Sequence, residues 1–189
     1  MKKRRACSRL FLLGCILFIK RLLLIGILFP FFPKLALTPE SGGVKTIGKA
    51  DMIRVDKSDR RRDLLRGGKV VATFAVALGR SPEGGKQMEG DMRTPEGRYT
   101  IDWRNPGSHY YRSLHISYPD KADKARAAKL GVAPGGDVMI HGQPNGYALP
   151  ASLLLQATDW TFGCIAVSNA DMNMIWNAVP DGAPIEILP

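Results

Sequence analysis

A succession of short β-type segments, each closed by a turn signal, constrains the fold of this chain more than any other feature. Such segments are rich in β-branched and aromatic residues and end at glycine, proline or polar residues. The expected strands span residues 50–55, 69–78, 98–103, 114–118, 137–141 and 184–188. Between the first two of these runs, Arg66-Gly67-Gly68-Lys69 is typical of a hairpin turn.

Helical character is confined to two segments of the body. Residues 120–130 are rich in alanine and lysine and stop at Gly131. Ser168-Asn169-Ala170-Asp171 fits a capping box that opens a helix to about Val179. Many short strands with two or three short helices predict a mostly-β or α+β domain, with a curved or barrel-like β-sandwich sheet.

The N-terminus has a different composition from the body. Residues 10–32 are almost entirely Leu, Ile, Phe and Gly, interrupted by Lys20 and Arg21. Two charges near a bilayer centre oppose insertion by about 5–7 kcal/mol, whereas some sixteen large apolar residues favour it by about 0.3–0.6 kcal/mol each. Two interpretations remain open: an uncleaved membrane anchor, or a secretory signal with Lys20-Arg21 as its charged flank.

The chain is therefore expected to have three parts. Residues 1–34 form a signal peptide or membrane anchor, residues 35–47 a linker rich in Pro, Gly, Ser and Thr, and residues 48–189 the folded domain. Both interpretations of the N-terminus place the domain outside the cytoplasm. We expect a protein of the cell envelope, periplasmic or otherwise extracytoplasmic, that is membrane-anchored or secreted.

The net charge of +10 does not indicate a nucleic-acid partner. Residues 1–34 hold eight basic residues and no acid, which leaves 19 basic and 17 acidic residues downstream. Most of the excess charge therefore belongs to the membrane-targeting segment. The run Arg60-Arg61-Arg62 is bracketed by Asp59 and Asp63, which favours a solvated turn or strand edge over a nucleic-acid contact.

Cys164 is the only cysteine outside the apolar N-terminus, so it cannot form a disulfide within the domain. Small residues flank it, which makes it a candidate nucleophile, although a buried and inert thiol is the alternative. A thiol with a pKa of about 8.5 needs a partner to react well at neutral pH. His141 ends an apolar run and precedes Gly142, so it is either a general base or a half-buried histidine bonded to a loop carbonyl.

The other histidines and the tryptophans give weaker indications. No carboxylate pair accompanies His109 or His115 at metal-ligand spacing, so we expect no metal site. His109 is expected in a loop or groove wall, and His115 on a strand face. Trp103, Trp160 and Trp176 are expected to pack in the core or a groove, and Trp160 is the best candidate for a substrate contact because it is near the thiol.

Two motifs together resemble the signature of the L,D-transpeptidase (YkuD-type) catalytic domain. That family has an Ile-His-Gly-like strand end followed by Ser/Thr-x-Gly-Cys, and this chain has His141-Gly142 and then Thr161-Phe162-Gly163-Cys164. Residues 79–99 look like the strand–loop–turn block of the family. Residues 159–169 look like its YafK-like murein transpeptidase branch. The resemblance covers residues 48–189, and it implies the fold of this catalytic domain.

The resemblance also implies a mechanism. Cys164 would attack the carbonyl of the L-centre of the diamino acid in a peptidoglycan stem peptide, forming a thioester and expelling a D-amino acid or a linked lipoprotein. His141 would act as base and acid, with the Gly142 backbone carbonyl orienting its ring. The Gly163 backbone amide would lie near the oxyanion. No metal or organic cofactor is needed. The expected partners are peptidoglycan stem peptides, and the inner membrane through residues 10–32 if these stay uncleaved.

Two departures from the family pattern leave the acceptor open. Members of the family often have His where this chain has Phe162, and Arg or Asn where it has Ala166. An amine acceptor gives a cross-link and water gives hydrolysis, so a murein hydrolase, amidase or carboxypeptidase using the same Cys-His pair is one alternative. A non-catalytic wall-binding module is the alternative from another class.

Overall fold

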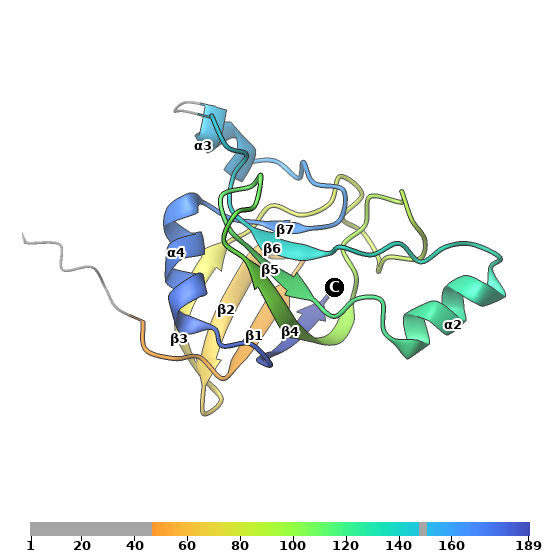
Figure 1. Cartoon of the computed structure of the whole chain (residues 1–189), viewed down its shortest axis with the longest axis horizontal. Coiled ribbons are helices and arrows are strands. Elements are labelled where there is room, and N and C mark those ends of the chain that lie inside the picture. Colours follow the sequence, from red (N-terminus) through yellow and green to blue (C-terminus); the bar gives the residue numbers. More distant parts are fainter. Residues whose placement is uncertain (1–46, 148–150) are drawn as a thin grey trace, which may run out of the picture. The chain divides into compact units, whose positions relative to one another are not determined.

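The computed structural model describes residues 47–147 and 151–189 (Figure 1). Its strands are β1 (Met52–Asp56), β2 (Arg61–Arg66), β3 (Lys69–Ala75), β4 (Gly97–Asn105), β5 (Ser113–Ile116), β6 (Met139–His141), β7 (Ile165–Ala166) and β8 (Pro184–Leu188). Its helices are α2 (Lys121–Lys129), α3 (Ala151–Gln156) and α4 (Asn169–Ala178). The predicted fold class, a curved sheet with short helices, is confirmed.

The eight strands form one mixed sheet in the order β3-β2-β1-β8-β4-β5-β6-β7. Neighbours are antiparallel except for two parallel pairs, β1 with β8 and β6 with β7. The sheet curls strongly, as Figure 1 shows. Ala77 and Ala166 exchange two backbone hydrogen bonds of 2.9 and 2.8 Å, which join the chain after β3 at one edge to β7 at the other.

Helix α4 covers the core that the curled sheet encloses. The Ser168 hydroxyl caps it by accepting a 3.0 Å hydrogen bond from the Asp171 amide, at the position where the sequence predicts a cap. Met172 and Ile175 on its inner face are fully buried. Helix α2 also starts and ends within a residue of the prediction, with Asp120 as its N-cap.

The expectation that Arg60-Arg61-Arg62 is a solvated turn or edge is wrong for its last member. Arg62 lies inside β2 opposite Val55 of β1, and strand alternation turns its side chain toward the core. It is 0% exposed, and its guanidinium lies over the Phe74 ring at 5.2 Å. β2 could not be predicted from the sequence because four of its six residues are charged, which masks the alternation of apolar and polar positions.

The expected signal or anchor at residues 1–34 and most of the linker lie outside the described residues. Within residues 47–147 and 151–189, no helix combines the length and the apolar character needed to cross a bilayer.

Candidate active site

The ends of two neighbouring strands bring the predicted nucleophile and base to one place. His141 is the last residue of β6, and Cys164 directly precedes β7. The two strands are parallel with His141 paired to Ala166, so Cys164 lies two residues before the partner of His141. Both residues line the same open cavity of about 810 Å³. One parallel strand pair thus brings together two residues that have twenty-two others between them in the sequence.

Cys164 keeps part of its surface exposed while protein surrounds most of its sulfur. Its thiol donates a 3.6 Å hydrogen bond to the backbone carbonyl of Asp137, just before β6. Burial raises the pKa of the Cys164 thiol, because the thiolate loses hydration, and the carboxylate of Asp137 adds to this. The ammonium of Lys86 acts in the opposite direction. The resting residue at neutral pH is therefore a neutral thiol.

His141 is buried, and its Nδ1 lies 2.6 Å from the backbone carbonyl oxygen of Gly142. Burial lowers the pKa of His141 to about 4, although the Gly142 carbonyl partly opposes that shift. The ring is therefore neutral at pH 7, with Nδ1–H donating to the carbonyl and the lone pair on Nε2. The rings of Tyr110 and Trp160 pack against the imidazole, with centroids at 4.6 and 5.6 Å.

Gly142 can hold that carbonyl in place because it has no side chain. A Cβ at this position would lie 2.6 Å from Asn169 Oδ1 and 2.9 Å from Tyr111 Cβ. The Gly142 amide donates a 3.2 Å hydrogen bond to the Arg112 carbonyl, which fixes the peptide plane. The structure contains the contact between Nδ1 and the Gly142 carbonyl, and the orienting role of that carbonyl stays a prediction.

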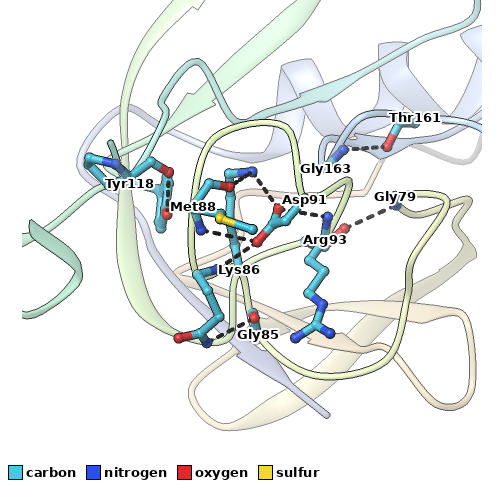
Figure 2. A network of polar contacts seen from close by, with 12 residues as sticks. Gly79, Gly85, Lys86, Met88, Asp91, Arg93, Tyr118, Thr161 and Gly163 are labelled. Atoms are coloured by element: carbon cyan, nitrogen blue, oxygen red, sulfur yellow. Dashed lines mark hydrogen bonds and ion pairs between the residues drawn. The ribbon is translucent and has the colours of Figure 1, made fainter. Parts of the chain in front are cut away.

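Gly163 adopts φ of 128°, a backbone conformation that favours glycine. Its amide donates a 3.1 Å hydrogen bond to Thr161 Oγ1 (Figure 2). The Thr161 hydroxyl in turn donates a 2.7 Å hydrogen bond to the Cys164 carbonyl. The Gly163 N–H, expected near an oxyanion, is therefore already paired. It can serve an oxyanion only by exchanging this bond.

Arg80 also lines the cavity, although the sequence does not predict this. Its guanidinium lies over the Phe162 ring at 4.9 Å, and its Nε donates a 3.2 Å hydrogen bond to the Trp160 carbonyl. Phe162 is 65% exposed, so this aromatic ring stands in solvent as a wall of the cavity. Among the lining residues, Arg80 supplies the fixed positive charge and Asp137 the carboxylate. No local motif around Arg80 marks it.

The remaining histidines and tryptophans divide between the cavity and the surface. His109 and Trp160 line the cavity, as expected. His115 projects from β5 onto Asp102, with Nδ1 and Oδ1 2.6 Å apart, and stacks on Trp103 at 5.1 Å. Trp103 is 42% exposed because its position on β4 faces solvent, so the expectation that it packs in the core or a groove is wrong. No group of three potential metal ligands occurs in the described part of the chain.

Residues 50–187 match the family model described as the YkuD L,D-transpeptidase catalytic domain, and the chain belongs to this family. It is 30% identical over 99 residues to YafK of Escherichia coli (strain K12), which carries the name of a candidate L,D-transpeptidase. That alignment covers 51% of this chain and 32% of YafK. The match thus spans about a third of the length of the curated relatives.

Two solved structures share the fold of this chain. A variant of the helical cell shape determining protein Pgp2 from Campylobacter jejuni aligns with a TM-score of 0.54 and 25% identity, over 77% of this chain and 51% of that one. Bd1075 from Bdellovibrio bacteriovorus aligns with a TM-score of 0.50 and 21% identity, over 77% and 52%. The latter likeness concerns the fold alone.

Proposed function

We propose that this protein is an L,D-transpeptidase that acts on peptidoglycan stem peptides through a thioester on Cys164. The observation that carries the proposal is the placement of Cys164 and His141 at the ends of adjacent parallel strands, on one solvent-open cavity. Membership of the L,D-transpeptidase catalytic domain family supports the choice of substrate. A wall-linked lipoprotein attached to the same stem position is a second leaving group compatible with this chemistry.

In the acylation step, Nε2 of His141 takes the thiol proton as the Cys164 sulfur attacks the carbonyl at the L-centre of the diamino acid. The tetrahedral intermediate then collapses, the bond to the leaving D-amino acid breaks, and His141 returns the proton to the departing amine. Because the pKa of the thiol is raised and that of the imidazole is lowered, both groups rest neutral. Proton transfer therefore accompanies the attack.

In the second step an acceptor attacks the thioester. When the acceptor is an amine, His141 takes its proton and passes it to the departing sulfur, and a new peptide bond forms. When the acceptor is water, the same transfer leaves a carboxylate on a shortened stem. The Gly142 carbonyl, 2.6 Å from Nδ1, supports the imidazolium that forms transiently. The backbone amide of Cys164, joined by that of Gly163 once its bond to Thr161 is exchanged, would hold the oxyanion.

The cellular location of the domain follows from the proposed substrate. Peptidoglycan is made and cross-linked outside the cytoplasm, so we propose that the domain works in the envelope. Residues 1–34 would deliver it there as a signal peptide, or hold it at the inner membrane through the apolar run 10–32. Residues 48–189 would form the catalytic domain.

The decisive experiment incubates purified full-length protein with muropeptides and analyses the products by mass spectrometry. We expect wild type to produce new cross-links and Cys164→Ala to produce none, since the thioester cannot form. The matched control is Cys7→Ser with Cys15→Ser, which removes the other thiols and should keep full activity. Full turnover by Cys164→Ala would exclude the covalent mechanism.

Parallel samples with muropeptides and with intact sacculi, analysed for products and for bound protein, separate the rival functions. Shortened stems without cross-links indicate a carboxypeptidase, and release of a wall-linked lipoprotein indicates an amidase. Tight binding to sacculi with no product in any sample indicates a wall-binding module. Each of these outcomes would replace transpeptidation as the assigned activity.

A further inference from the structure

A buried ion pair lies behind the segment that carries the nucleophile. Lys86 Nζ and Asp91 Oδ1 are 2.8 Å apart, with side chains only 5% and 8% exposed. Lys86 also donates a 3.1 Å hydrogen bond to the Met88 carbonyl. Burying an ammonium and a carboxylate costs several kcal/mol for each ion before their attraction is counted. A surface loop that needed only to connect β3 to β4 would not require such a pair.

Asp91 fixes the shape of this loop. Its carboxylate accepts hydrogen bonds from the backbone amides of Gln87, Met88 and Arg93, at 2.7, 3.1 and 3.1 Å (Figure 2). Burial pushes the pKa of Asp91 upward, but Lys86 and these amides outweigh burial and hold that pKa below its ordinary value. The loop therefore closes around a carboxylate that stays ionised with Lys86 as its counter-ion.

The loop in turn supports the nucleophile segment from behind. A Cβ on Gly163 would lie 2.6 Å from the Arg93 carbonyl oxygen and 4.0 Å from Lys86 Nζ. The Arg93 amide is one of the three that Asp91 binds, so a line of contacts runs from Lys86 through Asp91 and Arg93 to Gly163. Cys164 is the next residue.

We propose that Lys86 is a positioning residue for Cys164: clasped by Asp91, its buried ammonium holds the loop against Gly163 and places a fixed positive charge behind the reacting sulfur. The proposal deepens the function proposed above and rests on Cys164 as its nucleophile. A charge that is already in place before the reaction stabilises a developing thiolate or oxyanion without reorganisation.

The ammonium of Lys86 is one of several polar and charged groups near the Cys164 sulfur. His141 on β6 and the Asp137 carboxylate before β6 face the cavity from one side, and Arg80 lies on its wall. Asp137 disfavours the thiolate and Lys86 favours it. His141 is neutral, so Lys86 is the charged group that the protein holds buried on the thiolate-stabilising side.

The test is alkylation of Cys164 by iodoacetamide across a pH series, read from the Cys164 peptide by mass spectrometry in the full chain. We expect Lys86→Met to move the midpoint of the rate profile upward by about one pH unit, because an opposite charge nearby has been removed. Lys86→Arg keeps the charge and should return the midpoint most of the way to wild type.

The chain offers a matched control in a second lysine that contacts this loop. Lys57, which directly follows β1, is buried and pairs with the partly exposed Glu96 of the loop, with Nζ and Oε1 2.7 Å apart. Unlike Lys86, Lys57 is not among the groups that shift the pKa of Cys164. Lys57→Met removes a buried cation just as Lys86→Met does and should leave the alkylation midpoint of Cys164 unchanged. An equal shift in both variants would reduce Lys86 to a loop anchor and overturn the proposal.

Asp91→Asn provides a test that does not depend on losing the lysine. It removes the counter-charge and leaves the ammonium, so the midpoint should fall, in the direction opposite to Lys86→Met. A midpoint that stays or rises in folded Asp91→Asn would overturn the electrostatic role, even if Lys86→Met fails to fold. The alkylation readout needs no peptidoglycan, so failure of the muropeptide assay and failure of this proposal remain distinguishable.

Discussion

Single residues set the chemistry of the cavity, and Arg80 is the side chain best placed to choose its substrate. Its guanidinium is held over the Phe162 ring and against the Trp160 carbonyl, and it faces a cavity whose other fixed charge is the Asp137 carboxylate. Stem peptides carry free carboxylates that an arginine can bind in a bidentate way. Arg80 is therefore expected to bind the donor peptide.

For Arg80→Ala we expect a rise in KM of about tenfold for a stem with free carboxylates, about 1.4 kcal/mol. An amidated stem should show little change, because it offers the guanidinium no charge to bind. The measurement is steady-state kinetics with both peptides, and Arg98→Ala, in an exposed pair with Glu186, is the control. Equal loss for both peptides would mean that Arg80 only supports the cavity wall.

At the residue level, the sequence allowed a prediction only where a motif existed. Cys164 and His141 stood out as a lone thiol and as a histidine before glycine, and the structure brings both to one cavity. Arg80 and Lys86 could not be found in this way, because their importance comes from neighbours distant in sequence. Arg80 meets residues 160–162, and Lys86 lies behind residue 163.

At the scale of elements, β2 departs most clearly from the rule that core positions of a strand hold apolar residues. Arg62 occupies a core position of this strand, and none of its three guanidinium nitrogens has a hydrogen-bond partner among the described residues. Burial lowers the pKa of Arg62 to about 9, while the charge of Asp171 partly opposes that shift. The Phe74 ring offers a cation–π contact, which is weak against the desolvation of a whole guanidinium.

We therefore expect Arg62→Met to raise the free energy of unfolding by about 1–3 kcal/mol, since an apolar side chain of similar length removes an unpaired buried charge. Urea denaturation of both proteins at pH 7 measures the difference. Arg62→Lys keeps the charge and should give no gain. If Arg62→Met were less stable than wild type, the guanidinium would have a stabilising partner that outweighs its burial.

At the scale of the whole molecule, the sequence predicted the fold class but not how the sheet closes. Local patterns marked six of the strands, including β8 at its observed bounds. The two-residue strand β7 has no periodicity of its own and exists only through pairing with β6 and Ala77. That closure brings Cys164 to the cavity that His141 also lines, so the candidate site depends on long-range pairing that no local window contains.

The burial of His141 in this closed sheet also couples folding to pH. The pKa of His141 is about 4 in the folded protein against an ordinary value of 6.5. The unfolded chain therefore binds a proton first as the pH falls, and stability present above 6.5 is lost progressively between 6.5 and 4. From this group alone, wild type should lose about 2 kcal/mol between pH 7 and pH 5.

Replacing the imidazole with a group that does not titrate isolates this effect. We expect His141→Gln to lose about 2 kcal/mol less than wild type between pH 7 and pH 5, measured by urea denaturation at each pH. Asp91 does not interfere, because its lowered pKa makes its contribution fade only below its ordinary value of 3.8. Equal slopes for the two proteins would mean that His141 takes up a proton without unfolding, and that the ring is open to water rather than buried beside Tyr110 and Trp160.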